Sequence, residues 1–142
     1  MRILLAVDGS EASARAATQL VKNLGWYKSA PDIDLLTVHL PVPRLHNMSA
    51  VVTHEMIERH YGEESAAAMA PARAVLDAAG VRYAAHRAVG PIAETIVAQA
   101  NERGADLICM GTRGMTAFAN IVLGSVTTKV LHLAKIPVLL AP

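Results

Sequence analysis

Short, continuous apolar runs alternate along this chain with alanine-rich stretches of helical period, and this alternation constrains the fold more than any other feature. Such runs are typical of strands buried on both faces of a parallel sheet, which needs helices on each side. The runs are Ile3–Val7, Ile33–Leu40, Val81–Ala88, Leu107–Met110 and Ile136–Ala141. The helical stretches are Ser10–Leu24, Thr53–Ala79, Ile92–Arg103 and Ser125–Leu133. The pattern predicts an α/β fold, a doubly wound five-stranded parallel sheet in a single domain over residues 1–142.

Two elements depart from the regular pattern. The run at 81–88 alternates in polarity, with Arg82, His86 and Arg87 among alanines, so we expect it to be half exposed at an edge of the sheet. The second helical stretch contains Gly62 and Pro71, and an interior proline removes a backbone hydrogen bond. We therefore expect a break or kink there.

Composition excludes several classes of protein. The chain is 53% hydrophobic, yet no apolar run approaches the ~20 residues of a membrane span, and no signal-peptide core is recognisable. A net charge of +1 without a basic run argues against a nucleic-acid partner. The single cysteine, Cys109, lies in an apolar run, which predicts a small buried side chain and fits a reducing compartment. We expect a cytoplasmic protein without a membrane partner.

A glycine motif follows the fourth apolar run. Gly111-Thr112-Arg113-Gly114 is separated by nine residues from Gly124-Ser125, which opens the last helical stretch. Glycines permit positive φ and close approach of a ligand to backbone N–H groups, while Ser125 can cap the helix. Because helix N-termini carry partial positive charge, this pattern predicts a phosphate-binding site.

The same motif carries a family resemblance. Together with Ile3–Ser10 at the start and Pro137–Leu140 at the end, the Gly-x2-Gly-x9-Gly-Ser spacing resembles the universal stress protein family, in its ATP-binding branch. The resemblance implies a Rossmann-like sheet of strand order 3-2-1-4-5, related to the adenine nucleotide α-hydrolase-like fold. Asp8 and Gly111 would then end neighbouring strands where the winding reverses, the usual ligand position in open α/β sheets.

The resemblance implies ATP as the ligand. Asp8 would bind a ribose hydroxyl or help to hold a Mg²⁺ ion through the nucleotide phosphates. The backbone of Ala6 and Val7, with Val38, would contact adenine. The complete set of expected nucleotide-binding residues is Ala6, Val7, Asp8, Val38, Met110, Gly111, Thr112, Arg113, Gly114, Gly124, Ser125, Val126 and Thr127.

Simpler interpretations remain open for some of these residues. Asp8 could merely shape the turn into the first helix, Ser125 could be only a helix cap, and Arg113 could point into solvent. The sequence has no P-loop motif, and its histidines form no pair with zinc-ligand spacing. We assign no catalytic residue.

Three functions therefore stand side by side. The family resemblance favours a nucleotide-dependent regulatory homodimer with at most slow ATP hydrolysis, paired through the C-terminal strand Ile136–Ala141. A dedicated nucleotide-hydrolysing or phosphoryl-transfer enzyme of the same fold is the first alternative. A dimeric scaffold that binds no nucleotide is the second.

Overall fold

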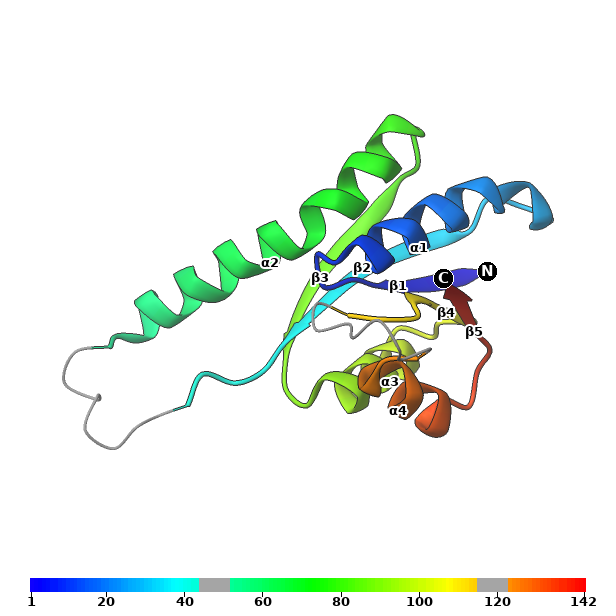
Figure 1. Cartoon of the computed structure of the whole chain (residues 1–142). Coiled ribbons are helices and arrows are strands. Elements are labelled where there is room, and N and C mark those ends of the chain that lie inside the picture. Colours follow the sequence, from blue (N-terminus) through cyan, green and yellow to red (C-terminus); the bar gives the residue numbers. More distant parts are fainter. Residues whose placement is uncertain (44–51, 115–122) are drawn as a thin grey trace.

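The computed structural model describes residues 1–43, 52–114 and 123–142 (Figure 1). The strands are β1 (Arg2–Ala6), β2 (Asp32–His39), β3 (Tyr83–Val89), β4 (Leu107–Gly111) and β5 (Val138–Ala141). The α-helices are α1 (Glu11–Lys22), α2 (His54–Ala78), α3 (Ile92–Glu102) and α4 (Ser125–Leu133), and a 3₁₀ turn covers Leu24–Trp26. Every predicted strand and α-helix is present, with bounds that differ from the prediction by two residues at most.

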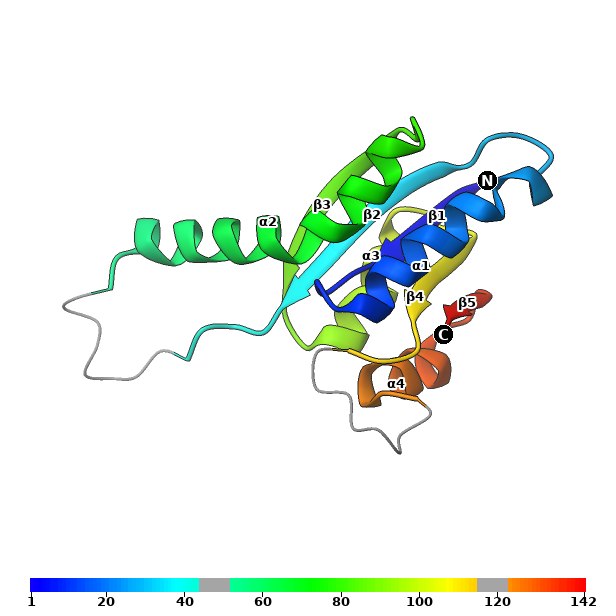
Figure 2. The same ribbon diagram turned by 45° about the horizontal axis from the view of Figure 1, so that its top comes forward.

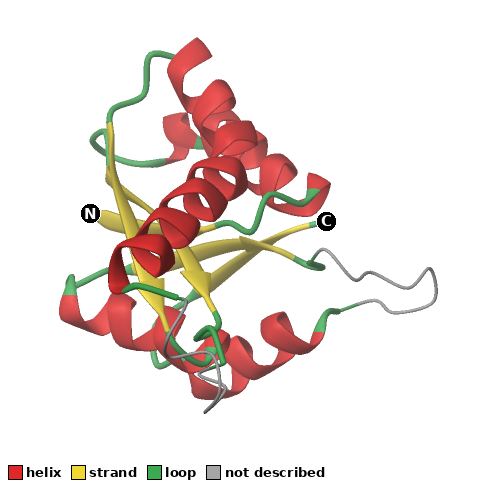
Figure 3. Cartoon of the chain, turned by 90° about the vertical axis from the view of Figure 1, so that its left-hand side faces the viewer, coloured by secondary structure: helices red, strands yellow, loops and turns green. Residues whose placement is uncertain are grey.

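The strands form one parallel sheet in the order β3-β2-β1-β4-β5, which confirms the order that the resemblance implied. The central strand β1 pairs on both sides: Leu5 lies opposite Leu35 of β2 and Cys109 of β4. Helices α1 and α2 cover one face of the sheet, and α3 and α4 cover the other (Figures 1 and 3). The direction of winding therefore reverses between β1 and β4.

The core has two halves because β1 and β4 are buried on both faces. Ile3, Leu5 and Cys109 pack toward α1 and α2, whereas Leu4 and Ile108 pack toward α3 and α4. All five are fully inaccessible to solvent. Full burial of each of the leucines and isoleucines stabilises the fold by roughly 1.5–3 kcal/mol. This explains why the central strands read as unbroken apolar runs.

Cys109 is a buried thiol, as predicted. Burial raises its pKa to about 12, so the group stays protonated at physiological pH and behaves as a small apolar side chain. No helix in the described part of the chain has both the length and the hydropathy that a membrane crossing requires.

The edge position predicted for β3 is confirmed. Its residues alternate between half-buried and exposed along most of the strand, although it begins at Tyr83 and not at Val81. Val81 is instead part of the turn that ends α2: Gly80 has a φ of +64°, and the Val81 N–H donates to the Leu76 carbonyl at 2.9 Å. This glycine-closed helix end uses the backbone donor that a longer strand would need.

Of the break or kink expected in α2, the break is absent and the helix bends instead (Figure 2). The helix is continuous over 25 residues with Pro71 inside it, although its axis bends along its length (Figure 2). One missing hydrogen bond is outweighed by burial of Met69, Ala72 and Leu76, which lie around the proline in the core. The first half of the helix extends beyond the sheet (Figures 1 and 2).

Candidate functional site

Asp8 lies two residues after the end of β1, at the point where the winding reverses. Asp8 is exposed to solvent. The Oδ1 atom accepts a hydrogen bond from the Ser10 N–H at 2.9 Å, so the turn-shaping interpretation of Asp8 holds for that oxygen. The Oδ2 atom lies toward the glycine motif, because a Cβ added to Gly114 would lie only 2.9 Å from it. One carboxylate oxygen thus builds the turn and the other faces the motif.

The two ends of the glycine motif are joined. The Gly124 N–H donates to the Thr112 carbonyl at 2.8 Å, and a Cβ on Gly124 would lie 3.4 Å from the Arg113 Cα. This contact brings the segment after β4 against the start of α4. The residues between the two ends lie outside the described part of the chain.

The sequence suggested that these glycines are needed because they permit positive φ, and this reason is wrong. Gly111, Gly114 and Gly124 are all described, and none of the three has a positive φ. What Gly111 needs is space: a Cβ there would lie 2.7 Å from the Ala12 backbone carbon and 2.8 Å from its oxygen. Gly111 therefore has a packing role of its own, since it lets α1 rest on the end of β4.

Gly9 is a residue that the sequence analysis did not single out. Its φ of +85° is open to few side chains, and a Cβ there would lie 3.2 Å from the Ala68 Cα of α2. An Asp-Gly pair directly after a strand is a recognisable turn signal and could have identified it. Gly9 therefore sets both the exit from β1 and the contact of this turn with α2.

The start of α4 differs from the prediction by one residue. Gly124 is the N-cap, because its carbonyl accepts from the Thr128 N–H at 2.9 Å, and Ser125 is the first helical residue with an exposed side chain. The prediction that Ser125 caps the helix is wrong. Thr127 is buried and donates its hydroxyl to the Gly111 carbonyl at 3.1 Å, so this hydroxyl is already engaged.

The remaining predicted residues lie on both faces of the sheet. Ala6, Val38 and Met110 pack together in the core half beneath α3 and α4, whereas Val7 packs in the opposite half. The Val7 N–H donates to the Leu36 carbonyl at 2.9 Å, and the Thr112 N–H donates to the Ala141 carbonyl at 3.0 Å. These two N–H groups already donate to carbonyls of neighbouring strands.

The structure therefore sorts the predicted set. Asp8, Arg113, Gly114, Gly124, Ser125 and Val126 come together around the start of α4, and Ala6, Val38 and Met110 form an apolar group beside them. Helix α4 is further fixed to α3 by an ion pair between Lys129 and Glu94, whose pKa is lowered by the hydrogen bond from that lysine. In the described ranges no three His, Cys, Asp or Glu side chains are grouped so as to hold a metal ion by themselves.

Comparisons with known proteins agree with this geometry. The sequence profile described as the universal stress protein family matches residues 1–142. A universal stress protein of Thermus aquaticus, from the 3' region of a QAH/OAS sulfhydrylase, is 37% identical over 97% of this chain and 96% of its own length.

Solved structures share the fold. That of the hypothetical protein MJ0577 has a TM-score of 0.78 and 28% identity, over 99% of this chain and 94% of the other. A universal stress protein in complex with cAMP has a TM-score of 0.73 and 21% identity, over 100% of this chain and 97% of the other. The strand order, the position of the glycine motif and the profile match over the whole chain lead to one conclusion: this chain belongs to the universal stress protein family.

Proposed function

We propose that this chain binds an adenine nucleotide, ATP, at the carboxyl ends of β1 and β4 and acts as a nucleotide-dependent regulatory homodimer. The observation that carries the proposal is the convergence of Asp8 Oδ2 and the start of α4 on Gly114. A nucleotide offers a sugar hydroxyl for the carboxylate and phosphates for the helix start.

The start of α4 supports phosphate binding. The first N–H groups of a helix have no partner within the helix, and Gly124 provides no side chain to accept from them. Their partial positive charge favours an anion, and a glycine cap leaves room for it. Arg113 would add a guanidinium to the phosphate side of the site.

Asp8 would repel a phosphate that came directly against it. It therefore suits the ribose hydroxyls, or a Mg²⁺ ion that also binds the phosphates. One carboxylate oxygen with phosphate oxygens and water is a usual environment for Mg²⁺, so the residue fits that ion. When bound, the ion would neutralise part of the phosphate charge.

Adenine is the base that the comparison favours, since a relative of the same fold was solved with cAMP. The apolar group of Ala6, Val38 and Met110 would lie against the base. Neither nearby charged group is an evident general base: Asp8 already accepts from the Ser10 N–H through Oδ1, and the Arg113 guanidinium stays protonated. We therefore propose binding with at most slow hydrolysis.

Calorimetric titration with ATP and Mg²⁺ tests the proposal, using Gly124→Asp and Gly124→Asn as a matched pair. Gly124 has a φ of −69°, a Cβ added there would make only ordinary contacts, and Asp and Asn are both favoured caps, so both variants should fold. We expect Gly124→Asp to weaken binding about tenfold or more, because a carboxylate would replace phosphate, and Gly124→Asn to weaken it much less.

The other outcomes distinguish the alternatives. No binding by the nucleotide-free wild type would overturn the proposal and favour the scaffold. Sustained phosphate release well above that of Gly124→Asp would favour the enzyme.

We propose that the dimer forms through β5, the second edge of the sheet. Val138, Leu139 and Leu140 are only half-buried there, and Pro137 precedes the strand, where a proline is tolerated. Light scattering should give a dimer at micromolar concentration that Val138→Lys disrupts and Leu131→Lys, on the exposed surface of α4, does not. A monomeric wild type would exclude the dimer while leaving nucleotide binding untouched.

A further inference from the structure

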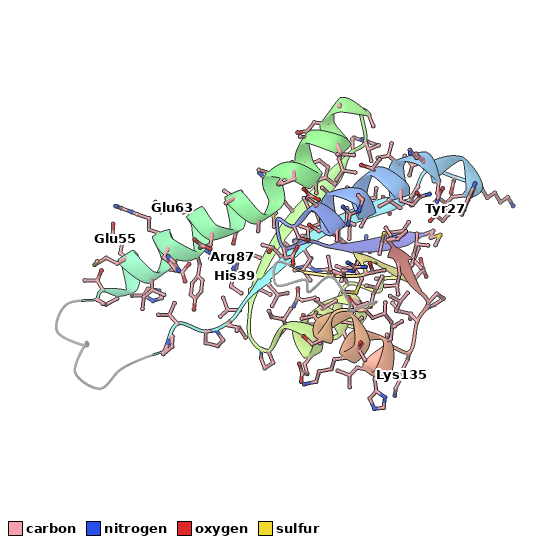
Figure 4. All side chains as sticks on the ribbon, viewed as in Figure 1. Tyr27, His39, Glu55, Glu63, Arg87 and Lys135 are labelled. Atoms are coloured by element: carbon pink, nitrogen blue, oxygen red, sulfur yellow. The ribbon has the colours of Figure 1, made fainter. Side chains whose placement is uncertain are left out.

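Three basic side chains lie around the ring of Tyr61. The ring centroids of His39 and His60 lie 6.2 Å and 6.0 Å from that of Tyr61, and the Arg87 guanidinium carbon lies 5.9 Å from it. These groups come from β2, α2 and β3, and Figure 4 shows His39 and Arg87 together where α2 passes the end of β2. We call this group the Tyr61 cluster.

The cluster holds the first half of α2 to the sheet through hydrogen bonds. His39 Nε2 lies 2.9 Å from the Ser65 Oγ atom, and the Ser65 hydroxyl donates to the Tyr61 carbonyl at 2.6 Å. Since that hydroxyl proton is used, His39 must be the donor in its own bond. The Val42 N–H donates to the Tyr61 hydroxyl at 2.7 Å, and Arg87 forms an ion pair with Glu58 at 2.7 Å.

Little apolar burial supports this part of the helix. In the range His54–Ser65, the buried residues are Tyr61 and Ser65. Glu55 and Glu63 of the same range are exposed (Figure 4). The second half contributes Met69, Ala72 and Leu76 to the core. The first half therefore depends on the Tyr61 cluster for its position.

We propose that the first half of α2, His54–Ser65, is a pH-sensitive arm, which is closed on β2 and β3 while His39 is neutral and opens when His39 takes up a proton. The ligand of this site is the proton itself. The proposal does not depend on nucleotide binding.

The surroundings of His39 explain why the arm opens at lower pH and not at higher pH. Burial, first of all, lowers the pKa of His39, the positive charges of Arg87 and His60 lower it further, and Glu64 opposes them. A lowered pKa in the closed state means that closure is most stable above the ordinary value of 6.5 and weakens as the pH falls through it. The weakening ends once the pH is below the lowered value of the closed state.

Protonation does not remove the hydrogen bond to Ser65, because the Nε2–H is present in both forms. What changes is the charge: a half-buried imidazolium on His39 would be poorly hydrated and would lie near the Arg87 guanidinium at the Tyr61 ring. Glu58 is already paired with Arg87, and Glu64 provides one further negative charge. Attraction of the cations to the Tyr61 ring offsets only part of the cost.

Hydrogen exchange of the full chain without nucleotide, at pH 7.5 and 5.5 and corrected for the pH dependence of chemical exchange, tests the arm. We expect opening of residues 54–65 to rise about three- to tenfold at the lower pH, while residues 107–111 of β4 stay protected. Equal protection of 54–65 at the two pH values would overturn the proposal.

Two histidine variants make the test specific. His39→Gln keeps an N–H donor for Ser65 but cannot take up a proton, so most of the pH effect should disappear. His54→Gln, at the exposed start of the same helix, should keep the full effect. An undiminished effect in His39→Gln would exclude His39 as the sensor. If that variant does not fold, NMR titration of the wild-type imidazoles decides, since a His39 pKa at or above 6.5 contradicts the proposal.

Discussion

Helices α1 and α4 begin at the same edge of the sheet, yet their first turns are built in opposite ways. At α1 the Ser10 N–H is bound by Asp8 Oδ1, and the Ser13 N–H is bound by the Ser10 side chain at 3.2 Å. At α4 the cap is Gly124, which has no side chain to offer. The chain caps the first helix start with its own side chains, whereas the start of the second has no capping side chain on Gly124 and is where we propose that an anion binds. This difference separates a structural turn at α1 from the proposed binding site at α4.

The largest expected effect comes from the contact between the end of β4 and the first turn of α1. Gly111→Ala places a methyl group 2.7 Å from the Ala12 backbone, which has no flexible end to move aside. We expect about 3 kcal/mol of destabilisation in chemical denaturation, since α1 would have to shift off β4. Gly25→Ala is the control: nothing lies within 4 Å of its Cβ position, so its effect should stay within about 0.5 kcal/mol. Equal effects of the two changes would contradict the packing role of Gly111.

Ser10 and Ser125, one at the start of each helix, test the difference between the two helix starts directly. Ser10→Ala removes a cap side chain and should destabilise the fold by about 1 kcal/mol. Ser125→Ala removes an exposed hydroxyl from the first helical position and should change stability by less than about 0.5 kcal/mol. Thermal unfolding of both variants measures this. A larger loss for Ser125→Ala would mean that the two helix starts are built alike.

The smallest expected effect on stability sharpens the role of Asp8. Asp8→Asn keeps an oxygen that can accept from the Ser10 N–H, so stability should change by less than about 0.5 kcal/mol. The variant loses the negative charge on Oδ2, and ATP affinity measured with Mg²⁺ should fall about tenfold if that oxygen serves the ligand. Unchanged affinity would leave Asp8 with the turn alone.

The fold was predictable because its signals are local or periodic. Continuous apolar runs identified β1 and β4, since strands buried on both faces need apolar residues at every position. Polarity alternation identified β3 as an edge, and Ser10 was recognisable as a cap from its type and position. The strand order came from the family resemblance and not from the pattern.

The candidate site was only partly predictable. Its residues could be found from the spacing of the glycine motif, but their individual reasons could not. That Gly111 accommodates α1, and that the Thr127 hydroxyl is bound to the Gly111 carbonyl, depends on how closely two packed elements approach. The spacing of residues along the chain does not give the distance between two packed elements.

By itself the sequence determined the class of fold and the position of each strand and helix, and it identified the segment that we propose binds phosphate. Backbone hydrogen bonding and apolar periodicity act over a few residues and can be followed along a chain. The tertiary structure alone decided that α2 continues through Pro71 and that His39, Tyr61 and Arg87 meet. Both depend on packing between segments that are distant in the sequence. The free energy of that packing exceeds the local backbone preference of single residues and cannot be recognised from neighbouring residues alone.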